Sequence, residues 1–296
     1  MSKKVICFGE ILWDVFPGGE KIGGAPLNIA LRLKSLGIAT TIVSKVGKDQ
    51  LGKRLIDFIH QQGIGTEYIQ QDAQFETGKV NVTLDQNGAA SYEIAYPAAW
   101  DKIDLVSTLE EEVAQADLFL FGSLVTRDVV SKKSLLSLLK KASFKVFDVN
   151  LRAPHYSQTL IEDLMQKADL IKFNDEELAE ISKAMGSQEK SLEKQLRFIS
   201  VKTNTPKVCV TKGGDGALLL LNDQLYDQKG FPIKVVDTVG AGDSFLATLL
   251  EGILTNKAPE IALENACAMG AMVASSTGAN PKITPEELHH FIKASK

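Results

Sequence analysis

The sequence predicts an α/β protein with a central, mostly parallel sheet that is flanked by helices. Short apolar runs of strand length alternate with amphipathic runs of helical length over most of the 296 residues. The apolar runs lack polar alternation, as is typical of strands that helices cover on both faces. One stretch, residues 77–96, does alternate, and it predicts a small antiparallel element beside the main sheet.

The strands and helices of the main unit are predicted in turn along the chain. Apolar runs predict strands at residues 5–8, 41–46, 118–121, 145–149, 170–173 and 208–210. Segments with helical periodicity lie at residues 27–36, 51–61, 131–141, 160–167 and 193–201. The C-terminal part is predicted to be helical over residues 245–254, 261–275 and 285–296. Gly37 and Gly63 stand where a left-handed residue would end the preceding helix.

The alternating stretch carries a strong hairpin signal. Residues 78–84 and 91–96 flank Asn87-Gly88, a dipeptide that two-residue hairpin turns favour. Residues 12–16 are able to supply another strand. We therefore predict a single unit over residues 1–296, in which residues 12–17 and 77–97 form a small β lid.

Composition and charge exclude several classes of protein. Lys and Arg number 33 against 37 Asp and Glu, and the resulting net charge of −4 argues against a nucleic-acid partner. No apolar run approaches the ~20 residues that cross a bilayer, which argues against a membrane protein. Three scattered cysteines, Cys7, Cys209 and Cys267, have no metal-binding spacing. They predict reduced thiols and a cytoplasmic location.

A glycine loop near the C-terminus is the most informative motif. Gly240-Ala241-Gly242 leads into a helix, so backbone N–H groups converge at the positive end of the helix dipole. That arrangement suits an anion, in particular a phosphoryl group in transfer. Asp243 lies in the first turn, where a carboxylate is able to accept a proton from an attacking hydroxyl. Capping of the helix is the alternative role for this residue.

A second glycine loop, Gly23-Gly24-Ala25-Pro26-Leu27-Asn28, opens a helix near the N-terminus. Neither loop is a Walker A motif or a dinucleotide fingerprint, so an oxidoreductase is not predicted. Together the loops resemble both signature patterns of the ribokinase-like (PfkB) carbohydrate kinases. The first pattern fits at Gly23, Gly24, Asn28, Ala30, Gly37 and Gly47, and the second fits at residues 237–243. The chain departs from the second pattern at Thr248, a packing position where the family usually has Gly or Ala.

This resemblance covers essentially the whole chain and implies an ATP-dependent sugar kinase with a ribokinase-like fold. It implies that Asp243 is the catalytic base that deprotonates the acceptor hydroxyl. The backbone amides of Gly240, Ala241, Gly242 and Asp243 would form the anion hole for the γ-phosphoryl group. ATP and Mg²⁺ are the expected cofactors, because phosphoryl transfer depends on positioning and charge neutralisation.

The sugar side of the site maps by the same resemblance onto Asp14, Gly24, Asn28 and Arg152. A carboxylate, an amide and a close backbone approach are suited to binding a polyol. Arg152 ends Asp148-Val149-Asn150-Leu151-Arg152, which resembles the DxNxR motif of fructokinases and ketodeoxygluconate kinases. Taken alone, Asp14 is better explained as an exposed acid and Asn28 as a helix-start residue, and a surface salt bridge is the alternative role of Arg152.

The nucleotide and metal sites are assigned by resemblance as well. Asn174 and Glu177 match an NxxE motif that organises Mg²⁺, in the case of Glu177 through water; acidic residues at a helix start are the alternative. Thr211, Gly213 and Gly216 match the nucleotide-side turn, although a plain hairpin turn would read the same. The adenine pocket is expected between that turn and the helix around residues 265–269, with Asn265 in contact. Asp237 is the candidate ligand of a monovalent cation such as K⁺.

The acceptor predicted first is D-fructose, because residues 9–16 and 147–152 look most like fructokinases. 2-Keto-3-deoxygluconate kinase is the second prediction, followed by ribokinase or nucleoside kinase. A non-enzymatic alternative is a sugar-binding regulatory protein on the same fold, which would be expected to have lost the base or the anion-hole loop. The predicted partners are the sugar and ATP, with a candidate homodimer through the lid.

Overall fold

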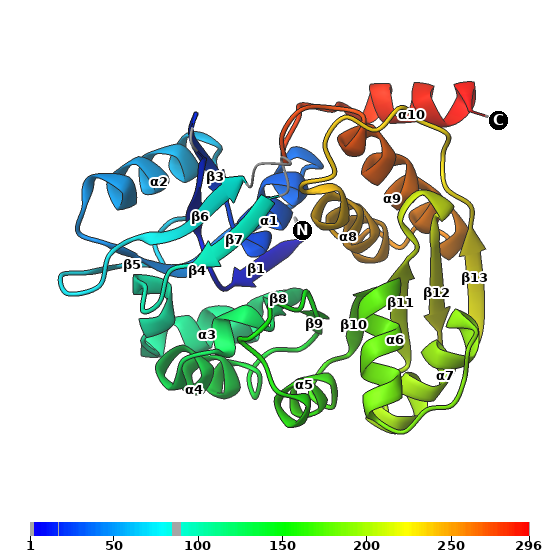
Figure 1. Cartoon of the computed structure of the whole chain (residues 1–296), viewed down its shortest axis with the longest axis horizontal. Coiled ribbons are helices and arrows are strands. Elements are labelled where there is room, and N and C mark those ends of the chain that lie inside the picture. Colours follow the sequence, from blue (N-terminus) through cyan, green and yellow to red (C-terminus); the bar gives the residue numbers. More distant parts are fainter. Residues whose placement is uncertain (1–2, 17, 85–89, 296) are drawn as a thin grey trace.

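The computed structural model describes residues 3–16, 18–84 and 90–295. Its centre is a nine-stranded sheet in the order β13-β12-β11-β10-β9-β8-β1-β4-β5 (Figure 1). Neighbouring strands from β5 to β11 are parallel, whereas β12 and β13 are antiparallel. The strands are β1 (Lys4–Phe8), β4 (Ala39–Gly47), β5 (Ile69–Asp72), β8 (Leu118–Gly122), β9 (Lys145–Asp148), β10 (Leu170–Asn174), β11 (Lys207–Thr211), β12 (Ala217–Leu221) and β13 (Gln224–Gln228). The fold is therefore the predicted α/β architecture.

Helices cover both faces of this sheet (Figure 1). One layer holds α3 (Ser107–Gln115), α4 (Val129–Leu138), α5 (Gln158–Met165), α6 (Asp175–Ala184) and α7 (Leu192–Thr203). The opposite layer holds α1 (Ala25–Ser35), α2 (Gln50–Gln61), α8 (Ala241–Leu254) and α9 (Pro259–Ala274), with α10 (Pro285–Ala294) packed on α9. Short 3-10 turns lie at Ala99–Lys102, Leu124–Thr126 and Gly213–Asp215.

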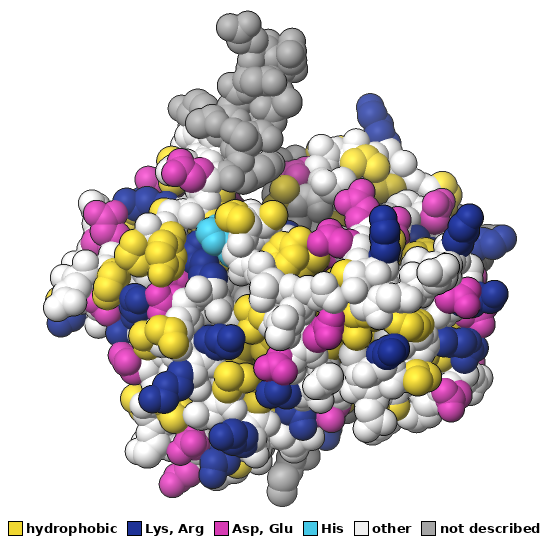
Figure 2. Space-filling model, turned by 60° about the horizontal axis from the view of Figure 1, so that its bottom comes forward, with side chains coloured by type: hydrophobic (Ala, Val, Ile, Leu, Met, Phe, Trp, Pro, Cys, Tyr) yellow, Lys and Arg dark blue, Asp and Glu magenta, His cyan; other side chains and the backbone are white. Residues whose placement is uncertain are grey.

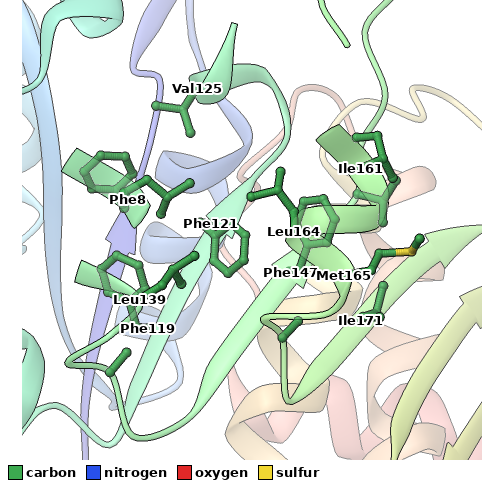
Figure 3. Close-up of a cluster of buried hydrophobic side chains, with 14 of the residues drawn as sticks. Phe8, Phe119, Phe121, Val125, Leu139, Phe147, Ile161, Leu164, Met165 and Ile171 are labelled. Atoms are coloured by element: carbon green, nitrogen blue, oxygen red, sulfur yellow. The ribbon is translucent and has the colours of Figure 1, made fainter. Parts of the chain in front are cut away.

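A row of aromatic side chains holds the middle strands against the first helical layer. Phe8, Phe121 and Phe147 are in register on β1, β8 and β9, and all three are fully buried (Figure 3). The rings of Phe121 and Phe147 stack with centroids 5.0 Å apart. Burial of such a side chain is worth roughly 1.5–3 kcal/mol. This row stabilises the register of the three strands, whose carboxyl ends lie at the same edge of the sheet.

A separate four-stranded sheet has the order β3-β2-β6-β7. Its strands are β2 (Leu12–Phe16), β3 (Gly19–Gly23), β6 (Gly78–Leu84) and β7 (Ala90–Ile94). Leu12, Val80 and Val82 form its own buried apolar cluster. The predicted hairpin strands are thus present as β6 and β7, which pair antiparallel. The predicted Asn87-Gly88 turn lies outside the described residues.

Several elements were not predicted from the sequence. Helix α3 buries only Leu109 and Val113, too few apolar positions for a clear helical period. Strand β3 is mostly exposed, and β12 and β13 form an antiparallel extension of the sheet. Gly37 and Gly63 do adopt the left-handed conformation, with φ of 85° and 71°.

The surface carries acidic and basic side chains interspersed over the face drawn in Figure 2. This mixture differs from the basic stripe that follows a nucleic-acid backbone. Within the described residues, no helix has the length and apolar character needed to cross a membrane. Cys7, Cys209 and Cys267 are buried, and none of them forms a disulfide.

Candidate active site

The C-terminal glycine loop begins α8 with an open cluster of backbone donors. Gly240 is the residue before the helix and adopts a left-handed φ of 76°, and a Cβ there would lie 2.5 Å from the Ala279 carbonyl oxygen. The Ala241 and Ser244 amides bond back to Thr238 and Gly240. Among the described residues, the amides of Gly242 and Asp243 have no acceptor. Free donors at a helix N-terminus form a ready anion site.

The Asp243 carboxylate lies at this helix start and is held from α1. Asn28 Nδ2 donates to Asp243 Oδ2 at 2.8 Å, and Asn280 Nδ2 donates to Asn28 Oδ1 at 2.7 Å. Burial, together with the charge of the nearby Asp148, raises the pKa of Asp243 to about 6. The Asn28 hydrogen bond and the charge of Lys172 oppose that rise. A carboxylate with this pKa is ionised near neutral pH yet basic enough to accept a proton.

The N-terminal glycine loop brings the predicted sugar-side residues to the same place. Gly24 precedes α1 with a φ of 110°, and a Cβ there would collide with the Glu10 carbonyl oxygen. The Asp14 carboxylate lies against Gly23, so no side chain fits between them. Burial raises the pKa of Asp14, against the charges of Lys21 and Arg152. Gly23 therefore allows a close backbone approach beside Asp14, and Gly24 allows one beside the Glu10 backbone.

Arg152 links the sugar-side residues to the base. The positive charge of Arg152 acts to lower the pKa of Glu10, Asp14 and Asp243, so Arg152 lies near all three carboxyl groups. Arg152 is exposed, and its guanidinium donates one hydrogen bond, to the Leu151 carbonyl oxygen. Its remaining N–H groups therefore have no acceptor within the described part of the chain.

Two buried ionisable residues of this site were missed by sequence reasoning. Glu10, which follows β1, is 4% exposed, and its Oε2 atom has no hydrogen-bond partner. Burial raises the pKa of Glu10 to about 7. Lys172, in the middle of β10, places Nζ 3.1 Å from Asp148 Oδ1. The available signal for Lys172 was a lysine inside an otherwise apolar strand, because lysines are rarely buried without a partner.

Asn174 and Glu177 are joined in a capping box at the start of α6. Asn174 Oδ1 accepts from the Glu177 amide, and Glu177 Oε2 accepts from the Asn174 amide. Glu177 Oε1 also accepts from the Leu151 amide at 2.9 Å, which fixes the loop that carries Arg152. Both carboxylate oxygens of Glu177 thus accept backbone hydrogen bonds. Within the described ranges, no group of three or more His, Cys, Asp or Glu is arranged to hold a metal ion.

The predicted nucleotide-side turn follows β11. Thr211 ends that strand, and its hydroxyl donates to the Phe173 carbonyl oxygen at 3.4 Å. Gly213 and Gly216 have positive φ of 55° and 96°. A Cβ at Gly216 would collide with the Gln228 carbonyl oxygen, so the turn requires glycine there.

The structure places Asn265, predicted to contact the nucleotide, in a cavity that the nucleotide-side turn does not line. Asn265 lines a cavity of about 200 Å³ between α8, α9 and α10, together with Thr248, Glu251 and His289. Cys267 lies two residues further along α9. Its pKa is affected by the charges of Lys212, in the turn, and Asp227, in β13, so Cys267 faces these elements. Residues two apart on a helix point in nearly opposite directions. The α9 face toward the turn therefore carries Cys267.

Asp237 connects the two loops around the start of α8. Its Oδ1 accepts from the Val239 amide at 3.0 Å, and its Oδ2 accepts from the Gly278 amide at 3.2 Å. The Asp237 amide itself bonds to the Ala274 carbonyl oxygen. The loop after α9 thus lies beside Asp237, as the cation prediction requires.

Comparisons with known proteins find relatives among sugar kinases. An uncharacterized sugar kinase from Pyrococcus horikoshii is 32% identical over 240 residues, covering 79% of this chain and 74% of that protein. A fructokinase from Klebsiella pneumoniae is 28% identical over 300 residues, covering 94% and 95%. A double mutant of the fructokinase of Vibrio cholerae O395, solved in a fructose-, ADP- and potassium-bound form, superposes with a TM-score of 0.84 at 22% identity, covering 98% of each chain.

A family model extends the match to nearly the whole chain. The model of the pfkB family of carbohydrate kinases covers residues 3–286, from β1 into the start of α10. That range includes both glycine loops, the small sheet and every site residue predicted from the sequence. With its ribokinase-like fold and both loops converging on Asp243, this chain belongs to the pfkB family of carbohydrate kinases.

Proposed function

We propose that this protein transfers the γ-phosphoryl group of ATP to a hydroxyl of D-fructose, with Asp243 as the general base. The observation that carries the proposal is the Asp243 carboxylate beside the free amides that begin α8. The acceptor hydroxyl gives its proton to Asp243 as its oxygen bonds to the γ-phosphorus. The bond from that phosphorus to the oxygen it shares with the β-phosphate breaks, and ADP leaves.

The chain supplies positioning and charge rather than covalent chemistry. The amides of Gly240, Gly242 and Asp243 would bind the oxygens of the phosphoryl group, where negative charge must be stabilised. The Ala241 amide, which was predicted to join them, donates instead to the Thr238 carbonyl oxygen. Glu177 would hold Mg²⁺ through water, and Mg²⁺ would offset the charge of the phosphates. Asn174, Thr211, Gly213 and Gly216 would bind the nucleotide from the adjoining strand ends.

Fructose is the proposed acceptor because fructokinases recur among the relatives. Asp14, Asn28 and the backbone at Gly24 would bind its hydroxyls. A second candidate acceptor is 2-keto-3-deoxygluconate, favoured by the unused donors of Arg152, since a guanidinium binds a carboxylate with two parallel hydrogen bonds. The regulatory alternative would require a lost base or a broken loop, and both features are intact.

A coupled assay of ADP formation tests the proposal over a panel of acceptors. The panel contains fructose, 2-keto-3-deoxygluconate, ribose, adenosine and the fructose phosphates, each at several concentrations. We expect the highest kcat/KM with fructose. Negligible turnover of fructose beside rapid turnover of another acceptor would overturn the assignment of the sugar. Absence of turnover with every acceptor would contradict the kinase reaction for this panel.

A monovalent cation near Asp237 is part of the same proposal. The side chain of Asp237 ties residues 237–240 to Gly278, and carbonyl oxygens of that second loop would complete a K⁺ site. Replacing K⁺ by tetramethylammonium at constant ionic strength is expected to lower kcat. Equal activity in both salts would rule out a required cation.

Dimer formation through the small sheet is also proposed, and light scattering at micromolar concentration tests it. Val80 and Val82, two apolar residues behind this prediction, are buried within the chain, whereas Tyr96 is 58% exposed. Leu84 belongs to the same prediction, and its side chain is not described.

The unpaired buried cysteines agree with a proposed location in the reducing cytoplasm, which cell fractionation would test.

A further inference from the structure

Lys172 directs its charge toward the start of α8. Successive residues of a strand point to opposite faces of the sheet. Leu170 packs in the layer that contains α8, whereas Ile171 and Phe173 pack in the opposite layer. Lys172 therefore faces α8, and its Nζ lies 3.6 Å from the point where a Cβ on Gly242 would stand. The ammonium group thus lies directly beside the anion hole.

The Lys172 side chain is fixed in this place by Asp148. Their Nζ–Oδ1 distance is 3.1 Å, and the exposed fractions of their side chains are 8% and 3%. Asp148 Oδ2 is buried without a hydrogen-bond partner. A buried ion pair contributes little net stability, because the loss of hydration offsets the attraction. A pair with an unused oxygen next to a functional loop is therefore better explained by the position of its charge.

Lys172 is the buried cation in a group of carboxylates. It interacts electrostatically with Asp148, Glu177 and Asp243, which come from β9, α6 and α8. ATP would bring further negative charge to the same place. A fixed positive charge beside the free amides of α8 would attract the phosphoryl group without side-chain reorganisation.

We infer that Lys172, held by Asp148, is a positioning residue for phosphoryl transfer: it keeps a positive charge under the first turn of α8, where the phosphoryl group and Asp243 meet. The inference rests on the proposed function, since it takes that helix start as the anion hole. It predicts two separable effects of Lys172, one on the phosphoryl group and one on the ionisation of Asp243.

The two members of the pair, Lys172 and Asp148, shift the pKa of Asp243 in opposite directions. The charge of Lys172 lowers the pKa of Asp243, whereas the charge of Asp148 raises it. The other groups that face Asp243 are Asn28 from α1, Arg152 from the loop after β9 and Glu10 from the loop after β1. These groups are unchanged in variants of the pair. Substitution of Lys172 and substitution of Asp148 should therefore shift the acid limb of the pH–rate profile in opposite directions.

The test measures kcat and kcat/KM from pH 5 to pH 9 in three variants. Lys172→Met should lower kcat about tenfold or more at pH 8 with a smaller change in the KM for ATP, and should move the acid limb up by about one pH unit. Asp148→Asn keeps an oxygen for Lys172 and should move the limb down. Lys172→Met with Asp148→Asn should return the limb toward that of the unmodified protein while kcat stays low. Lys183→Met, an exposed cation on α6, is the matched control.

A merely structural role would lower thermal stability without moving the acid limb. An unmoved limb in Asp148→Asn, or a double variant that keeps the unmodified kcat, would overturn the inference, and these two variants decide it even if Lys172→Met does not fold. Asp243→Asn separates this outcome from a failure of the proposed function. If Asp243→Asn keeps its activity, the base assignment is wrong. If it is inactive while the pair variants leave the profile unchanged, only the role of Lys172 is wrong.

Discussion

Asn28 Nδ2 lies 2.8 Å from Asp243 Oδ2, although 215 residues separate them in the chain. Helix α1, which follows the first glycine loop, packs on α8, which follows the second. This contact brings the two helix starts together. Asn28 is 6% exposed and also accepts a hydrogen bond from Asn280. The residue assigned to the sugar is thus also the residue that orients the base.

Removal of the base is the most direct test of the site. Asp243→Asn keeps the size of the side chain but leaves no group that accepts the hydroxyl proton. We expect kcat to fall by about 10²–10⁴-fold, the usual contribution of a general base. The affinity for ATP, measured by calorimetry, should change little. Asp163→Asn, an exposed position on α5, is the control, and near-normal turnover of Asp243→Asn would contradict its role.

The hydrogen bonds behind the base should affect rate in a graded way. Asn280→Ala removes one bond to Asn28 and should lower kcat about fivefold, as expected for about 1 kcal/mol. Asn28→Ala removes the bond to Asp243 itself and should cost more, with a higher KM for the sugar. Steady-state kinetics of both variants would check the order. An Asn280→Ala enzyme slower than Asn28→Ala would contradict the arrangement.

The two glycines of the anion hole should respond differently to alanine. At Gly240, a Cβ would meet Ala279 in a left-handed backbone, so Gly240→Ala should lower the unfolding free energy by about 1–3 kcal/mol. At Gly242, the nearest atom to a Cβ is Lys172 Nζ at an ordinary 3.6 Å. Gly242→Ala should therefore keep the Tm but lower kcat. Equal Tm values for the two variants would contradict this difference.

Glu10 should make stability depend on pH. Its pKa is raised from 4.5 to about 7 by burial, so between these values the folded protein holds a proton that the unfolded chain has released. Stability from this group is therefore present below pH 4.5 and is lost as pH rises through 7, by about 3 kcal/mol. Glu10→Gln should become more stable relative to the unmodified protein between pH 4.5 and pH 8. Denaturant titrations would check this, with the exposed Glu111→Gln as a control; a constant difference would disprove it.

The nucleotide side offers a test of the face of α9. Asn265 lines the cavity beside α10, so Asn265→Ala should leave the KM for ATP unchanged. Thr211→Ala, at the end of β11, should raise that KM. A rise of the KM in the Asn265 variant would show that this residue reaches the nucleotide after all.

Many local features of this protein were determined by the sequence alone. Apolar runs identified the six central parallel strands, and the alternating residues identified the strands of the hairpin. The glycine loops identified the helix starts that hold Asp243 and Asn28. These features are predictable because strand alternation, helix capping and glycine conformations depend on residues close together in the chain.

The charges of the site were decided only by the tertiary structure. Nothing near Lys172 in the chain indicates that Asp148 is its partner, and nothing near Glu10 indicates a buried oxygen without one. Which face of α9 meets the nucleotide turn depends on how α8 and α10 pack against it. The cost of a buried charge depends on its neighbours in space, and packing sets those neighbours.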